Sequence, residues 1–307
     1  MKASAQDVLT AKIYFAAAFP ALRIPLEEDA AQAKKFEKVN AVVEFRAADD
    51  ANPVACYMVF LTADMAEKAV HEKRFKVFQG EYPGYIEMKD GSKYDGLKVV
   101  KMYFKSIPSL LGVFKGSSPV EMLGIVSPLL KNIFNPVTLK FLFLMLTLTK
   151  TMPSFNPGTD QPWEQYLKVK LSLFLITRAL STANREGWPE IVDWVKKQPD
   201  RTYQFIVGPT LDKNGKEIYP EIKSYFRVKQ GRAKAGNGER KYPFVLFKFP
   251  NPDGCLAVLT GRYEFVEAVS KGAVTIYGAA DSYAVSFNDL MTKCQAMLVP
   301  PPKPEKK

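Results

Sequence analysis

Histidine and cysteine are scarce in this chain of 307 residues, which holds one histidine, His71, and three cysteines, Cys56, Cys255 and Cys294. A zinc site built from clustered Cys and His ligands is excluded, because no recognised spacing of these residues is present. A Ser-His-Asp or Cys-His nucleophile would depend on His71 alone. Three scattered cysteines form no disulfide framework, so we expect a reducing, cytoplasmic setting and assign no metal, cofactor or catalytic residue.

Long hydrophobic runs are also lacking. The most apolar run, residues 141–146, lies between Lys140 and Lys150 and is far shorter than the ~20 residues that span a bilayer. It predicts a buried helix or an apolar wall beside a hydrophobic ligand. The apolar stretch 13–19 follows Asp7 and has no basic segment before it, so it predicts a packed N-terminal helix rather than a signal peptide.

Basic side chains outnumber acidic ones by 43 to 32, which gives a net charge of +11 and favours anionic partners. The most basic window, residues 223–241, sets seven Lys and Arg side chains against Glu239 alone. We interpret this window as the solvated face and tip of a β-hairpin and expect no nucleic-acid partner. A basic nucleic-acid binder is kept as a third hypothesis, which predicts binding that weakens steeply with salt.

Proline and glycine are concentrated at residues 151–163, where we place a linker. It separates an N-terminal domain, residues 1–150, from a C-terminal domain, residues 164–299. Residues 300–307 are rich in proline and charge, which predicts a disordered tail.

Hydrophobic periodicity predicts mixed strands and helices in the C-terminal half. We expect strands at 202–207, 222–228, 242–249 and 273–277, the third of them buried on both faces. We expect helices at 163–184, 190–197, 255–260, 263–270 and 283–298, and a glycine-rich loop at 231–238.

The N-terminal half predicts strands at 39–46, 54–62, 75–78, 85–88 and 99–104. The last of these matches residues 244–249, and a short apolar helix ending in glycine follows each. Residues 120–130 then take the place of residues 265–270. These matches indicate a degenerate internal repeat.

Residues 256–290 carry the most distinctive pattern. A short helix ends at Gly261, an apolar helix ends in Lys271-Gly272, and a strand then closes at Gly278 before a final helix. This pattern resembles the core of the sterol carrier protein 2 (SCP2) lipid-transfer family. The resemblance covers residues 202–298, and it extends to residues 39–150 only through the repeat.

The resemblance implies an α+β fold in which helices cover one face of a five-stranded, mostly antiparallel sheet, here in two such modules. It also implies an apolar tunnel for a fatty acid, fatty acyl-CoA, sterol or phospholipid, and no chemistry. We expect the tunnel to be lined by a subset of the large apolar residues of the second module, any one of which could instead be core. These candidates are Phe244, Phe247, Phe249, Leu256, Leu259, Phe265, Val269, Ile276, Tyr277, Phe287, Met291 and Met297. Arg262 or Lys271 could meet an anionic head group at its rim.

Two apolar helices, 137–148 and 166–180, need a partner. They could pack between the modules, close one shared cavity, or form a patch that docks on a membrane or on a second copy of the chain. The favoured hypothesis is that the protein is a non-enzymatic carrier of a hydrophobic ligand and makes transient contact with a membrane. The alternative is an enzyme, or an accessory subunit of one, that acts on a lipid or steroid substrate.

Overall fold

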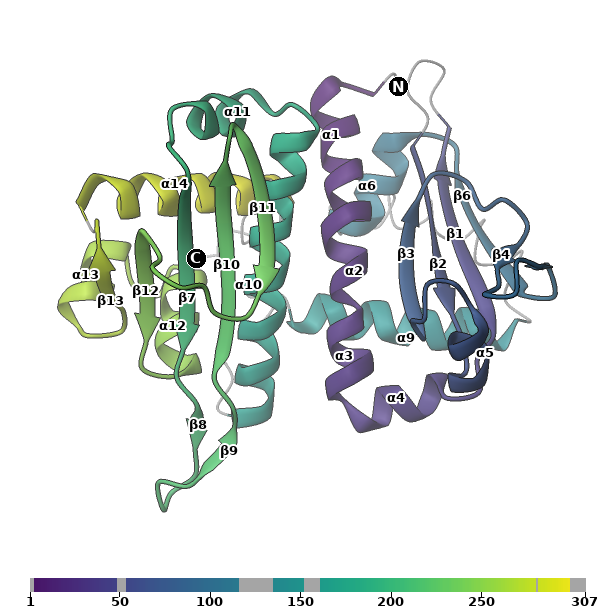
Figure 1. The fold of residues 1–307 in the computed structure, drawn as a ribbon, viewed down its shortest axis with the longest axis horizontal. Helices are drawn as coiled ribbons and strands as arrows, with labels where there is room; N and C mark the ends of the chain where they lie inside the picture. The colour runs from purple at the N-terminus through teal and green to yellow at the C-terminus, as the bar shows by residue number, and fades with distance from the viewer. Residues whose placement is uncertain (1–2, 49–53, 116–134, 152–160, 280, 299–307) are drawn as a thin grey trace, which may run out of the picture. The chain divides into compact units, whose positions relative to one another are not determined.

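The computed structural model describes residues 3–48, 54–115, 135–151, 161–279 and 281–298 (Figure 1). The chain is a mixed α+β protein with several sheets, as expected, and it divides into two compact units, Met1–Leu148 and Thr149–Lys307. The predicted helix at 120–130, the predicted tail and most of the predicted linker lie outside the described residues.

In the first unit, one four-stranded sheet has the order β3-β2-β1-β6, with β1 antiparallel to β2 and parallel to β6. The strands are β1 (Ala41–Ala47), β2 (Val54–Phe60), β3 (Phe75–Gln79), β4 (Ile86–Glu87), β5 (Lys93–Tyr94) and β6 (Lys98–Phe104). The helices are α1 (Ala5–Ile13), the π-helix η1 (Tyr14–Ala18), α2 (Phe19–Ala21), α3 (Arg23–Glu28), α4 (Ala30–Phe36), α5 (Ala63–Lys68), α6 (Ile107–Lys115) and α9 (Pro136–Thr151). A five-stranded sheet was predicted here, and the main sheet that the described residues form has four strands.

The N-terminal helical run Ala5–Glu28 is long and apolar enough to cross a membrane by length and composition, but 61% of its apolar 18-residue stretch is buried. The rings of Phe15 and Phe19 lie 6.4 Å and 4.9 Å from the ring of Phe45 in β1. This packing against the sheet accounts for the apolar composition of the run.

Helix α9 contains the most apolar run of the chain. The ring of Phe141 lies 5.7 Å from Phe45 and 6.4 Å from Phe60, on the same side of the first sheet as the N-terminal helices. The opposite side of α9 exposes Leu139, Phe143 and Leu146, so the run is only partly buried.

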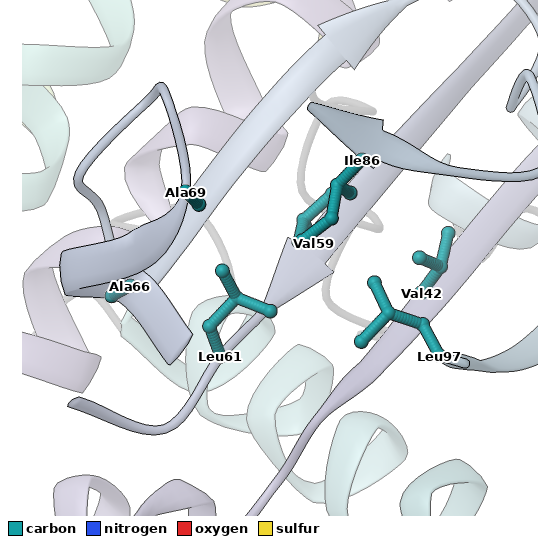
Figure 2. Close-up of a cluster of buried hydrophobic side chains, with 7 residues drawn as sticks. All are labelled: Val42, Val59, Leu61, Ala66, Ala69, Ile86 and Leu97. Atoms are coloured by element: carbon teal, nitrogen blue, oxygen red, sulfur yellow. The ribbon is translucent and has the colours of Figure 1, made fainter. Parts of the chain in front are cut away.

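The other face of the first sheet is covered by segments of the same unit. Figure 2 shows side chains of β1 and β2 meeting α5 and the β4 region in one buried cluster. Its members are Val42, Val59, Leu61, Ala66, Ala69, Ile86 and Leu97. Apolar residues therefore occupy both faces of this sheet.

In the second unit, the main sheet has five strands in the order β11-β10-β7-β12-β13, and only the β7–β12 pair is parallel. The strands are β7 (Arg201–Val207), β8 (Thr210–Leu211), β9 (Glu217–Tyr219), β10 (Ile222–Lys229), β11 (Arg232–Asn237), β12 (Val245–Phe249) and β13 (Thr275–Gly278). The helices are α10 (Pro162–Arg185), α11 (Pro189–Lys196), α12 (Pro252–Leu259), α13 (Phe265–Ser270) and α14 (Asp281–Leu298).

Two expectations for this sheet are wrong. Residues 232–237 form strand β11 rather than a glycine-rich loop. Strand β12 begins only at Val245, and its exposed Lys248 shows that one face alone is buried. Helix α10 packs against β10, β11, α11, α12 and α14, which explains why its sequence is apolar nearly all round.

The two main sheets share a strand order, because β1, β2, β3 and β6 follow one another as β7, β10, β11 and β12 do. In the first unit a crossing segment runs from β3 toward β6, and in the second unit one runs from β11 to β12. Each donates a hydrogen bond to a buried polar side chain on the central strand, β1 or β7. The N–H of Tyr82 donates to Glu44 Oε1 at 3.0 Å, and the N–H of Arg240 donates to Gln204 Oε1 at 2.9 Å.

The start of each crossing segment is also equivalent. Gly80 and Gly238 both have a φ of 92°, a left-handed conformation that glycine adopts at little cost. Their N–H groups donate to the carbonyls of Ala55 and Lys223, each at 2.9 Å. The two units thus share contacts as well as topology.

Candidate functional site

An aromatic layer lies between the second sheet and its helices. The ring of Phe287 in α14 lies 4.4 Å from Tyr203 and 6.0 Å from Phe205, which are inward-facing residues of β7. The ring of Phe247 in β12 stacks on Phe205 at 5.0 Å and lies 6.2 Å from Phe287. Such ring contacts at 4.5–7 Å are typical of a packed apolar interior.

Five predicted ligand-binding residues are buried in or beside this layer. They are Phe247, Phe249, Leu256, Phe287 and Met291. They come from β12, α12 and α14, so the predicted elements do converge on one side of the sheet. Their burial makes them part of the core of the unit.

Four further predicted residues are only half-buried, and we call them the apolar margin: Leu259, Phe265, Ile276 and Met297. The ring of Phe265 lies 6.0 Å from that of Phe247, and Ile276 pairs with Phe247 across β12 and β13. The carbonyl of Leu259 accepts a hydrogen bond from Gln295 Nε2 of α14 at 3.3 Å. Phe265 of α13 and Ile276 of β13 therefore border the buried layer, and Leu259 ends α12 beside α14, the helix that carries Met297.

The remaining three predicted residues do not join the margin. Tyr277 pairs with Leu246, so it lies on the opposite face of the sheet from Phe247, and half of it is exposed. Val269 is exposed on α13. Phe244 precedes β12, and the guanidinium of Arg201 lies 3.8 Å from its ring centroid.

Sequence reasoning missed the contribution of the earlier strands to the aromatic layer. Tyr203, Phe205 and Phe226 are buried, and the ring of Trp194 in α11 lies 5.6 Å from Phe287. Residues 202–207 and 222–228 did predict strands, the second from its alternation, and both are present as β7 and β10. The predicted ligand-binding residues all lie within 244–297, and these two strands precede that range.

The charged side chains near the margin form ion pairs at the surface. Arg262 Nη2 lies 2.9 Å from Asp253 Oδ1, and Lys271 Nζ lies 2.7 Å from Glu267 Oε1. These are the two cations predicted at the rim. In the described part of the chain, no group of three or more His, Cys, Asp or Glu side chains could hold a metal ion.

All three thiols are buried. Burial raises the pKa of Cys294 to about 12, and it raises the pKa values of Cys56 and Cys255 well above their usual range. Since the thiolate is the reactive form, these cysteines are poor nucleophiles at neutral pH.

The native protein is therefore expected to resist a thiol reagent such as 5,5′-dithiobis(2-nitrobenzoic acid). In urea, all three thiols should react, because unfolding exposes them and returns their pKa values to the ordinary range. Absorbance after mixing measures both. Rapid reaction of one thiol in the folded protein would contradict the burial described above.

No protein-family model matches the chain, and no curated protein matches it. Similar solved structures include the sterol carrier protein domain 2 of Helicoverpa armigera, with 20% identity and a TM-score of 0.30, covering 40% of this chain and 87% of that one. Another is a conserved hypothetical protein of Thermus thermophilus, described as possibly sterol carrier protein, with 16% identity and a TM-score of 0.30, covering 43% and 90%. A sec-alkylsulfatase from Pseudomonas sp. has 11% identity and a TM-score of 0.22, covering 58% and 31%. Similarities this weak do not assign the chain to a family.

Proposed function

We propose that the second unit binds and carries a hydrophobic ligand, of the class of a fatty acid, fatty acyl-CoA, sterol or phospholipid, at the apolar margin. The observation that carries the proposal is the position of the margin. Four large apolar side chains from separate elements stay half-buried, and two of them, Phe265 and Ile276, lie beside Phe247 of the aromatic layer.

A ligand that covered the margin would remove apolar area from water at both partners. Burial is worth about 0.8 kcal/mol per methylene, so a chain of about twelve could support micromolar affinity without a polar contact.

The proposal is for carriage without catalysis. The nearest thiols, Cys255 and Cys294, are buried and have raised pKa values. The nearest charged pairs, Arg262–Asp253 and Lys271–Glu267, lie at the surface, where they could border the head group of a ligand.

Two neighbouring residues of α13 provide a matched test. Phe265→Asp would place a charge in the margin, and it is expected to weaken uptake of a fluorescent fatty acid by tenfold or more. Val266→Asp adds the same charge at a position that is already 72% exposed, so it is expected to bind as the unmodified protein does. Fluorescence titration of the full chain measures both.

Circular dichroism should show that both variants are folded. A folded Phe265→Asp variant that binds normally would place the ligand elsewhere. Comparison of native with denaturing mass spectra of protein purified from cells would identify any bound lipid. Protein that carries no lipid and takes up no fatty acid would contradict carriage.

A further inference from the structure

The face of the second sheet that points away from its helices carries closely spaced cations. Side chains on this face alternate along β10 and β11, and the strand register sets Arg227 opposite Lys234 and Lys229 opposite Arg232. We call these four residues the cationic face. Like charges directly opposite each other in a sheet are destabilising. No ion pair involving any of the four is found among the residues the structure describes.

The crossing segment, residues 238–244, lies on the same face. It is fixed there by the bond from the Arg240 N–H to Gln204, and Figure 1 shows it passing in front of β10 and β7. It adds Lys241 and also Tyr242, which is 95% exposed and has a φ of 55°. A fully exposed tyrosine thus stands beside the cationic face.

In the first unit, the equivalent face of the sheet is covered by apolar segments of that unit. There the equivalent strand positions are the paired Val42 and Val59, which pack under α5 and the β4 region (Figure 2). In the second unit the equivalent pair is Thr202 and Arg227. Because a threonine and an arginine replace the valines, and three further cations lie beside that arginine, a partner on this face must be polar and anionic.

We propose that the cationic face docks the protein on the anionic phospholipid head groups of a bilayer surface. Four to five cations on one flat face suit a surface of phosphates and carboxylates, and an exposed tyrosine is typical of the membrane–water interface. A single-stranded nucleic acid would also need free aromatic rings for base stacking. Tyr242 could stack on one base, but the ring of Tyr225, central on this face, is already covered by the guanidinium of Arg240 at 4.4 Å, so successive bases would lack a stacking platform.

This docking does not require the ligand proposed above, so the two proposals can fail separately. The test uses the full chain free of lipid, sedimented with vesicles of phosphatidylcholine alone or of phosphatidylcholine mixed with phosphatidylserine. Binding is expected only with phosphatidylserine, and it should weaken as salt is added.

The decisive variant replaces one opposed pair, Arg227→Ser with Lys234→Ser. Each Lys or Arg near an anionic membrane contributes about fivefold in affinity, so vesicle binding is expected to fall about 25-fold. The control removes the same charge from the β8–β9 turn, Lys213→Ser with Lys216→Ser, and should change binding much less. Removing opposed like charges should also leave the unfolding transition in urea unchanged or shifted to higher urea.

Three results would overturn the proposal. One is equal binding to vesicles with and without phosphatidylserine. Another is an equal loss of binding in the control, which would indicate that net charge alone matters. The third is salt-sensitive binding of a single-stranded oligonucleotide without binding to either kind of vesicle.

Discussion

Replacing Phe287 with alanine is expected to lower the free energy of unfolding of the second unit by about 3–5 kcal/mol. The ring is fully buried and lies between β7, β12 and α11, so its removal leaves a cavity that several elements would have to collapse to fill. Urea unfolding followed by tryptophan fluorescence measures the change. The three tryptophans, Trp163, Trp188 and Trp194, all lie in the second unit, so the signal reports that unit alone.

The control is Tyr277→Ala, which removes a ring of similar size from the opposite face of the sheet. Tyr277 is half exposed, so its loss is expected to cost less than about 1 kcal/mol. Similar costs for the two variants would mean that the aromatic rings do not form a closed layer. In that case the division between a buried core and a half-buried margin would have no basis.

Strand β11 shows why part of this fold could not be predicted from the sequence. Three glycines lie within 231–238, a composition that is typical of a loop. In the structure, Gly236 pairs with Tyr225, and a Cβ at position 236 would collide with the Tyr225 ring. The glycine leaves room for the Tyr225 ring over a strand, and this role depends on a neighbour eleven residues away in the chain.

Tyr277 shows a different limit. Residues 273–277 predicted a strand, and a strand is present at Thr275–Gly278. Alternation separates the two faces of a strand, but it does not say which face meets the helices. Pairing with β12 decides this, since it places Ile276 beside Phe247 and Tyr277 beside Leu246.

The helices and most strands were accessible because their signals are local. Pro189 begins α11 as a proline at the first helical position should, and Gly261 and Gly272 end α12 and α13 with a φ of 71°. The apolar positions that converge from β12, α12 and α14 could be named from the same patterns. Their sorting into buried and half-buried residues could not, because burial depends on packing between distant segments.

Gln204 is the residue whose role depends most on such a distant partner, and its replacement by leucine is expected to cost about 2–4 kcal/mol of unfolding free energy. The side chain is fully buried. Its Nε2 donates to the carbonyls of Ser224 and Gly238 at 2.9 Å and 3.1 Å, and its Oε1 accepts from the Arg240 N–H. Leucine fills a similar volume but leaves these main-chain groups without their partner.

The more informative variant is Gln204→Glu, because Glu44 holds the equivalent position in the first unit. There both carboxylate oxygens accept bonds, from the Tyr82 N–H at 3.0 Å and the Tyr103 hydroxyl at 2.6 Å. At position 204 a carboxylate would keep the bond from Arg240 but would face carbonyl oxygens where Nε2 now donates. We therefore expect Gln204→Glu to destabilise the second unit at least as much as Gln204→Leu does, although Glu44 at the equivalent position makes the change look conservative.

Urea unfolding followed by tryptophan fluorescence tests both variants. Gln295→Glu is the matched control, since the half-buried Gln295 makes a single longer bond to Leu259 and should tolerate the change within about 1 kcal/mol. A Gln204→Glu variant as stable as this control would mean that the crossing segment is not held by the carboxamide. Arg240 would then stay over Tyr225 through the bond from its N–H to position 204 and through the bond that its Nη2 donates to the Tyr225 hydroxyl at 2.8 Å.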